Sequence, residues 1–142
     1  MPNTGPEPES VSPLRVVAGI ILAPAADHIL LARRPPHKHL GGLWEFPGGK
    51  LEAGETPAAG LARELAEELA IRVLHCEHYL SLDHDYGDRR LQLEAWLVRA
   101  FAGQAIGNEG QEITWVERRH LDRYPMPAAN IAIAAALRAV AP

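Results

Sequence analysis

The sequence contains almost no cysteine, since Cys76 is the only one among 142 residues. A lone cysteine excludes an internal disulfide framework and a cysteine-rich zinc site, and it favours a reducing compartment, so we expect a cytoplasmic protein. The sequence also lacks any apolar run near the roughly 20 residues that a membrane span needs. Its first ten residues, MPNTGPEPES, lack the basic and then apolar order of a secretory signal. We therefore expect no membrane partner.

Basic charge is scarce as well. Fourteen Lys and Arg residues against eighteen Asp and Glu residues leave a formal net charge of −4. A protein that coats a nucleic-acid backbone carries the opposite balance, so polymeric nucleic acid is not an expected partner. The acidic residues are concentrated in one place, because six of the eighteen lie between Glu45 and Glu68. Because the charge is arranged locally, the composition does not exclude a small anionic substrate.

The composition of the rest of the chain is that of a packed domain. Apolar residues make up 47% and charged residues 23%, and 142 residues is the usual size of one domain with one core. Residues 1–13 hold four prolines and almost nothing apolar, so we expect a disordered N-terminal tail. Residues 14–142 show no repeat and no linker. We expect them to form a single domain, and the protein to be a monomer.

Apolar patterns predict an α+β fold. β-branched and alternating runs predict strands, and the segment after Thr56-Pro57 together with an Ala- and Ile-rich C-terminal segment predicts two helices. We expect strands at residues 14–23, 28–33, 44–46, 71–82, 90–101 and 113–116, loops around 34–43 and 48–54, turns at 24–27 and 86–88, and a terminal helix at 127–140. Strands before and after a central helix indicate a mixed sheet with helices packed on it.

The central helix carries a cluster of carboxylates. Thr56 can cap the first free backbone N–H groups, and proline is tolerated at the first helical position, so the helix is expected to begin there. With about 100° per residue, Glu64, Glu67 and Glu68 crowd within an arc of roughly 100°. The apolar residues of this helix face almost the other way. One side therefore packs on the sheet while the other presents clustered negative charge.

Two interpretations of the cluster are open. A solvated acidic face is the common explanation, but like charges three and four residues apart destabilise a helix by a few tenths of a kcal/mol each. Arg63 offers one compensating charge nearby. A hard divalent cation such as Mg²⁺ would relieve all three carboxylates, because it prefers oxygen ligands, and it would recruit phosphate oxygens as further ligands.

A longer pattern begins at Gly49. Gly49, then Glu55, then Arg63-Glu64-Leu65-x-Glu67-Glu68-x-x-Ile71 resembles the Nudix box, G-x5-E-x7-R-E-U-x-E-E-x-G-U, in which U is bulky and apolar. Every fixed position matches except the last glycine, which is Ala70 in this sequence. In the family that glycine ends the helix, often in a left-handed conformation that costs alanine about 1 kcal/mol. The departure concerns local stability and leaves the ligand positions intact.

The resemblance to the Nudix family implies a fold and a chemistry. The fold is an α/β/α sandwich, with a mixed central sheet between the box helix and a C-terminal helix. The chemistry is hydrolysis of nucleoside diphosphates linked to another moiety, with Mg²⁺ or Mn²⁺ as cofactor. Glu64, Glu67 and Glu68 would hold the metal together with the backbone carbonyl of Gly48.

The same resemblance gives two other residues of the box a role. Arg63 would orient Glu64, which is the candidate to accept the proton of the attacking water or to position the metal. Glu55 would brace the loop before the helix. From the residues alone, Glu55 is equally well explained as a solvated acid favoured by the helix dipole.

From residue 14 onward the chain also resembles the MutT-type nucleoside triphosphate pyrophosphohydrolases of this family. The resemblance implies a nucleotide pocket and one metal ligand outside the helix. Carried over one at a time, Arg34 and His39 would flank the nucleotide, Glu45, Phe46, Pro47 and Gly48 would line its pocket, Arg89 would close over the base, Asn130 would bind the edge of an oxidised purine, and Glu109 would be the remote metal ligand. The residues by themselves leave a core position open for Phe46 and a helix cap open for Asn130.

The implied substrate is 8-oxo-dGTP, cleaved to the monophosphate and pyrophosphate, which would keep the oxidised nucleotide out of DNA. The alternative within the family is a pyrophosphohydrolase of CTP or modified pyrimidine triphosphates, a type that tends to carry an acidic residue where this chain has Asn130. An alternative of another class is a non-catalytic Nudix-like module that binds nucleotides for regulation. Such modules typically lose box carboxylates, and this chain keeps them all.

Overall fold

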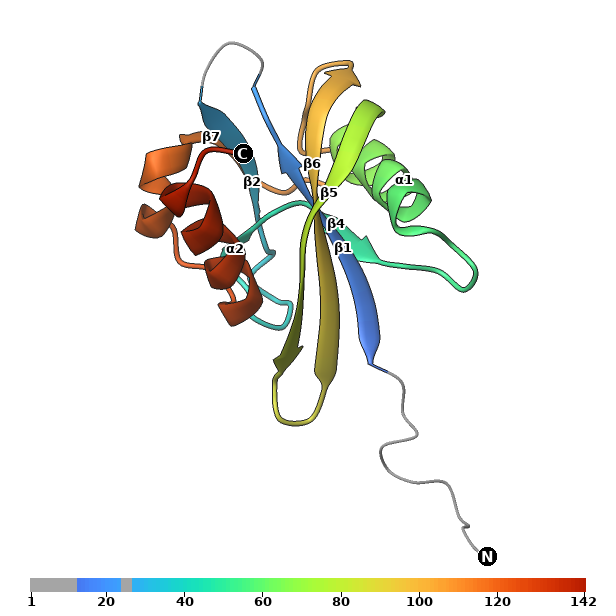
Figure 1. Cartoon of the computed structure of the whole chain (residues 1–142), viewed down its shortest axis with the longest axis vertical. Coiled ribbons are helices and arrows are strands. Elements are labelled where there is room, and N and C mark those ends of the chain that lie inside the picture. The colour runs from blue at the N-terminus through green and yellow to red at the C-terminus, as the bar shows by residue number, and fades with distance from the viewer. Residues whose placement is uncertain (1–12, 24–26) are drawn as a thin grey trace, which may run out of the picture.

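The computed structural model describes residues 13–23 and 27–142 (Figure 1). The expected N-terminal tail therefore lies outside the described residues except for Pro13, as does most of the turn expected at 24–27. The strands are β1 (Leu14–Ile21), β2 (His28–Arg33), β3 (Trp44–Glu45), β4 (Gly48–Lys50), β5 (Arg72–Asp85), β6 (Arg90–Ala102) and β7 (Ile113–Glu117). The helices are α1 (Pro57–Leu69), the 3-10 helix η2 (Arg118–Arg123) and α2 (Ala128–Ala139).

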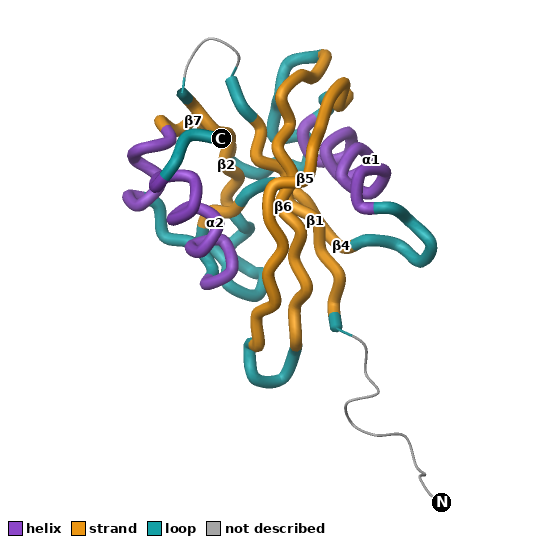
Figure 2. The backbone as a smooth tube through the Cα atoms, in the orientation of Figure 1, coloured by secondary structure: helices purple, strands orange, loops and turns teal. Residues whose placement is uncertain are grey.

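The strands lie between the two α-helices (Figures 1 and 2). A mixed sheet has the order β4-β1-β6-β5, in which β1 runs parallel to β6 and the other neighbours are antiparallel. A smaller antiparallel sheet has the order β3-β2-β7. Helix α1 packs against β4, β5 and β1, while α2 packs against η2 and β5. This arrangement confirms the α+β sandwich, with its strands divided between two sheets.

Strand β1 is buried on both faces, which explains its continuous apolar sequence. Val17 and Ile21 belong to the core cluster on the α1 side, and Ile20 belongs to the cluster on the α2 side. Successive side chains of a strand point to opposite faces, so one β-branched run supplies both layers. The α1 layer is completed by Leu61, Leu65 and Leu69, and the α2 layer by Ile133 and Leu137.

The prediction of a loop at residues 48–50 is wrong, because Gly48 and Gly49 begin strand β4. They pair with β1, Gly48 opposite Ala18 and Gly49 opposite Val17. A Cβ at Gly48 would collide with the backbone oxygen of Val17, and one at Gly49 would lie 2.5 Å from the Glu64 carboxylate. The glycines therefore mark a close approach of backbone and side chain instead of a turn. Helix η2 was not predicted either, and β5 runs on to Asp85 instead of ending at residue 82.

Both ends of α1 agree with the sequence. The Thr56 hydroxyl accepts a hydrogen bond from the Ala59 backbone N at 3.2 Å, and Pro57 is the first helical residue. Ala70, which replaces the glycine of the box, ends the helix with φ 58° and ψ 35°, and its N–H donates to the carbonyl of Ala66 at 3.2 Å. Ala70 thus keeps the left-handed conformation, although its Cβ makes that conformation unfavourable.

We expect Ala70→Gly to raise the free energy of unfolding by roughly 1 kcal/mol, because glycine adopts the left-handed conformation without a steric cost. The exposed Ala66, a right-handed residue in the last turn of α1, is the matched control, and Ala66→Gly should lower the stability by up to about 1 kcal/mol. Urea denaturation of the two variants measures both changes. A loss of stability in Ala70→Gly comparable to that in Ala66→Gly would contradict the observed helix end.

Candidate active site

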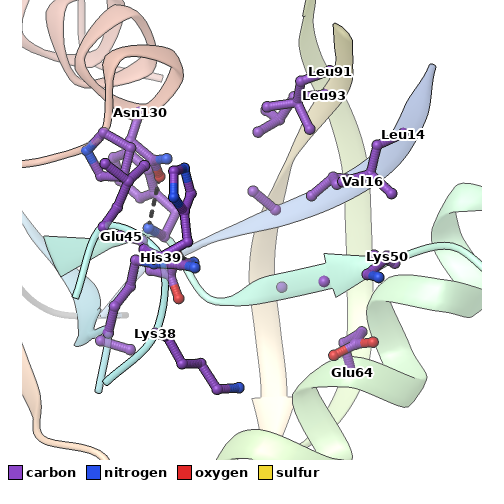
Figure 3. A pocket seen from close by; sticks show the side chains of 18 of the residues that line it. Leu14, Val16, Lys38, His39, Glu45, Lys50, Glu64, Leu91, Leu93 and Asn130 are labelled. Atoms are coloured by element: carbon purple, nitrogen blue, oxygen red, sulfur yellow. Dashed lines mark hydrogen bonds and ion pairs between the residues drawn. The ribbon is translucent and has the colours of Figure 1, made fainter. Parts of the chain in front are cut away.

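A cavity of about 1030 Å³ lies between the strands, the 34–43 loop, α1 and the start of α2 (Figure 3). Most of the residues expected at a site from the sequence line this one cavity. They are Arg34, His39, Glu45, Phe46, Gly48, Glu64, Glu68, Arg89, Glu109 and Asn130. Pro47, Arg63 and Glu67 are not among the lining residues. The topology thus brings segments more than 90 residues apart into one site.

One end of the cavity holds the carboxylates of α1. The side chains of Glu64 and Glu68 both line it, and the Glu64 side chain is 15% exposed. The Glu67 side chain is 54% exposed, and its carboxylate lies 3.5 Å from Nη1 of Arg63. The structure therefore brings two of the three helix glutamates into the cavity. Glu109 reaches the same end from the loop between β6 and β7.

Glu68 lies among other carboxylates at this end of the cavity. Burial raises the pKa of Glu68 to about 9, with a further contribution from its hydrogen bond to Glu64 and from the charges of Glu64, Glu45 and Glu109. A cation close to Glu68 would stabilise its ionised form and lower its pKa.

This donor set fits a divalent cation. In residues 13–23 and 27–142 no three His, Cys, Asp or Glu side chains are already grouped so as to hold a metal ion. Mg²⁺, however, is usually bound by one or two carboxylates together with waters and substrate phosphates. The adjacent oxygens of Glu64 and Glu68 meet that requirement.

Arg63 holds the Glu64 carboxylate in place. Its Nε and Nη2 donate to the two oxygens of Glu55 at 2.8 and 2.9 Å, and its Nη1 donates to Oε2 of Glu64 at 2.9 Å. Nη2 also donates to the backbone carbonyl of Lys50 on β4 at 3.1 Å. Glu55 accepts in addition from the backbone N of Glu52 at 2.9 Å. Glu55 thus braces the loop, as the resemblance implies, and the planar guanidinium fixes Glu64 relative to β4.

Asn130 and Phe46 form the opposite end of the cavity. Asn130 lies inside α2, whose N-cap is Pro127, so the helix-cap interpretation is wrong. Its Oδ1 accepts a hydrogen bond from the backbone N of Phe46 at 3.0 Å (Figure 3). Among the described residues the Asn130 amide nitrogen has no hydrogen-bond partner. The Phe46 ring is both part of the core and part of the cavity wall.

Arg34 and Glu45 make a half-buried ion pair in the cavity wall. Nη1 of Arg34 donates to Oε1 of Glu45 at 2.8 Å, and its Nε donates to the backbone carbonyl of His39 at 2.8 Å. Burial raises the pKa of Glu45, although the Arg34 hydrogen bond and charge and the Lys38 charge oppose that rise. Arg34 therefore connects the 34–43 loop to the wall and fixes His39 beside the cavity.

Sequence reasoning missed several lining residues. Leu14 and Val16 of β1 and Leu91 and Leu93 of β6 lie together and form an apolar wall of the cavity (Figure 3). Alternation along β1 and β6 was the available signal. Lys38 and Lys50 also line the cavity, and they are the only lysines of the whole sequence.

The sequence matches the model of the NUDIX domain over residues 17–136. The chain therefore belongs to the Nudix family, as the box and the sandwich indicated. It is a Nudix hydrolase, an enzyme that acts on phosphorus-containing anhydrides, and enzymes of this family generally depend on divalent metal ions. None of the helices in the described part of the chain has the length and apolarity to cross a membrane.

Three known proteins show how similar the chain is to particular members of the family. The 8-oxo-dGTP diphosphatase of Escherichia coli (strain K12) is 36% identical over 125 residues, which span 88% of this chain and 96% of that protein. The CTP pyrophosphohydrolase of the same organism is 38% identical over 127 residues, spanning 89% and 93%. A solved MutT structure, of the Aliivibrio salmonicida or the Vibrio cholerae protein, has a TM-score of 0.81 at 40% identity and covers 90% of this chain and 98% of that chain.

We expect the contribution of Glu55 to stability to depend on pH. The hydrogen bonds from Arg63, and next that from the Glu52 backbone, lower the pKa of Glu55 from 4.5 to about 2. A lowered folded-state pKa means that the contribution is complete above pH 4.5 and is lost as the pH falls towards 2. The urea midpoint of Glu55→Gln should therefore differ most from wild type at neutral pH, and the difference should shrink across that acid range.

The control is Glu52→Gln, because the exposed Glu52 carboxylate lies 3.7 Å from Nε of Arg63 and makes a weaker contact. It should show a smaller difference from wild type at neutral pH. A Glu55→Gln difference that stays constant through the acid range would show that the carboxylate of Glu55 is not ion-paired with Arg63.

Proposed function

We propose that this chain is a nucleoside triphosphate pyrophosphohydrolase that cleaves 8-oxo-dGTP, and also dGTP, to the monophosphate and pyrophosphate. Removal of the oxidised nucleotide before polymerisation would sanitise the nucleotide pool and prevent mutation. The observation that carries the proposal is a single cavity with paired carboxylates at one end and the Asn130 amide at the other. The 8-oxo-dGTP diphosphatases of Escherichia coli and Haemophilus influenzae, 36% and 39% identical, support it.

The Asn130 end suits a nucleobase. Because Oδ1 is engaged by the Phe46 backbone N, the Asn130 amide nitrogen is left to donate to a base carbonyl. The Phe46 ring and the apolar wall of β1 and β6 supply flat and aliphatic surface beside it. In this proposal Arg34, His39, Glu45 and Pro47 shape the remaining wall, and Arg89, on the β5–β6 hairpin, closes over the base.

The carboxylate end suits the polyphosphate and its metal. We propose Mg²⁺, or Mn²⁺, held by Glu64 and Glu68, with Glu67, Glu109 and the Gly48 carbonyl as further ligands. When bound, such an ion neutralises phosphate oxygens and lowers the pKa of the attacking water. Glu64, fixed by Arg63, is the residue placed to accept the proton of that water. Lys38 and Lys50 add positive charge facing the phosphates.

Hydrolysis of CTP or of modified pyrimidine triphosphates is the second candidate. The similarity to the CTP pyrophosphohydrolase of Escherichia coli, 38% identical over 127 residues, favours it. Both candidates use the same carboxylate end and break the same bond, so they differ only at the base. This chain has the amide Asn130, with its nitrogen left to donate, where the cytidine type tends to carry an acidic residue, and we therefore give the purine priority.

We propose a cellular location and an oligomeric state as well. We infer a cytoplasmic location, because free nucleoside triphosphates are the substrate. We also infer that a monomer is sufficient, because one chain supplies both ends of the cavity.

A turnover panel of 8-oxo-dGTP, dGTP, CTP and 5-methyl-dCTP tests the substrate. We expect the highest kcat/KM for 8-oxo-dGTP, with pyrophosphate and not phosphate as the second product. Asn130→Ala should lower the kcat/KM for 8-oxo-dGTP by about tenfold or more, since one good base contact contributes about 1–3 kcal/mol of discrimination. A wide preference for the cytidine nucleotides would overturn the purine assignment.

Two controls accompany the panel. Glu64→Gln should lose most turnover of every nucleotide while it keeps its fold by circular dichroism, and unchanged turnover would reject the mechanism and suggest a regulatory module. Thermal unfolding of Asn130→Ala shows how far the loss of the Phe46 hydrogen bond affects the fold. The purine assignment requires that its kcat/KM fall more for 8-oxo-dGTP than for CTP.

A further inference from the structure

The loop between β6 and β7 is fastened to the C-terminal end of α1. The backbone N of Ile106 donates to the carbonyl of Leu69 at 3.0 Å, and that of Asn108 donates to the carbonyl of Glu68 at 2.9 Å. The Asn108 side chain donates to the carbonyl of Glu67 at 2.9 Å. The last carbonyls of a helix have no partner within the helix, so this loop supplies partners for them. The chain thereby holds a distant loop against the turn that carries the box glutamates.

Gln111 adds a different kind of link. Its Nε2 donates to the Glu68 carbonyl at 2.9 Å, and its Oε1 accepts from the Glu109 backbone N at 2.9 Å. One neutral amide therefore joins the backbone of a helix glutamate to the backbone of the loop glutamate. The Gln111 side chain is half-buried, and it lines the cavity together with Glu68 and Glu109.

Among the described residues, the bond to Gln111 is the one hydrogen bond of Glu109 itself, while its neighbours Asn108 and Gly110 are held by backbone bonds. Glu109 is exposed, and within the described part of the chain its carboxylate makes no ion pair. Its negative charge is repelled by Glu64 and Glu68 across the same cavity. A flexible loop would relieve that repulsion by turning Glu109 towards solvent, away from the other carboxylates.

We propose that Gln111 is a positioning residue that holds Glu109 facing the Glu64 and Glu68 carboxylates, so that the loop glutamate takes part in binding the divalent cation. The inference rests on the metal site of the proposed function. It goes beyond capping of the helix, because a cap alone would leave the position of Glu109 unaffected. Replacing a residue that hydrogen-bonds to a metal ligand, without binding the metal itself, typically changes the metal affinity by about 10- to 100-fold.

Asn108 is the matched control. It is an amide of the same loop and bonds the same end of α1, but its side-chain hydrogen bond goes to the Glu67 carbonyl and not to Glu109. Binding of Mn²⁺ to the full chain, without nucleotide, is measured by electron paramagnetic resonance for wild type, Gln111→Ala and Asn108→Ala. We expect both variants to melt at lower temperature by similar amounts, and Gln111→Ala alone to bind Mn²⁺ about tenfold or more weakly.

A double-mutant cycle tests whether Gln111 affects Mn²⁺ binding through Glu109. Glu109→Gln should itself weaken Mn²⁺ binding, and adding Gln111→Ala to it should cause no further loss, because the residue that Gln111 positions is already neutral. Equal Mn²⁺ affinities of Gln111→Ala and Asn108→Ala, or a full additional loss in the double variant, would overturn the inference.

The outcomes separate this inference from the proposed function. A wild-type protein that binds no Mn²⁺ would overturn the metal site and the role of Gln111 together. A wild-type protein that binds Mn²⁺ no better than Gln111→Ala would overturn the role of Gln111 alone. A preference for CTP in the turnover panel would leave the Mn²⁺ result, and with it the role of Gln111, unaffected.

Discussion

The pairing of two carboxylates, Glu64 and Glu68, in a half-buried cavity is the constraint on which the rest of the structure depends. Two like charges so placed repel each other more strongly than they would in water, and burial disfavours each of them separately. The raised pKa of Glu68 follows from this burial and from the neighbouring carboxylates. The nearby guanidinium of Arg63 does not resolve this repulsion, because it is engaged with Glu55 and with only one oxygen of Glu64. In the proposed function, a divalent cation supplies the missing positive charge.

The fold provides rigid support on each side of this pair. Buried leucines hold α1 against the mixed sheet, and the close pairing of β4 with β1 leaves room for the Glu64 carboxylate only because residue 49 is glycine. On the other side of the sheet, α2 brings Asn130 to the backbone of Phe46, immediately before β4. The carboxylate end and the Asn130 end of the cavity are therefore both attached to the short segment 46–49, which fixes their separation.

The sequence predicted the layers and the chemistry better than the details of the backbone. Periodicity predicted that the carboxylates share one face of α1, and the spacing of the box predicted a metal-binding role for them, since both patterns are local. The strand at Gly48 was missed because its glycines serve a contact with β1 and Glu64 that only the tertiary structure creates. Gln111 and the lysines were missed for the same reason: each becomes meaningful only when segments far apart in the chain meet at the cavity. For Asn130, the structure was needed to exclude a helix cap and to show that the residue lines the cavity.

The most direct test of the central claim is a crystal structure with Mn²⁺, in which the anomalous signal locates the ion independently of any assumption about ligands. Our account predicts a strong peak in contact with the carboxylates of both Glu64 and Glu68, lost in crystals of a variant in which Glu64 is replaced by glutamine. Glu64 and Glu68 side chains directed apart into solvent, with no anomalous peak between α1 and β4, would contradict it.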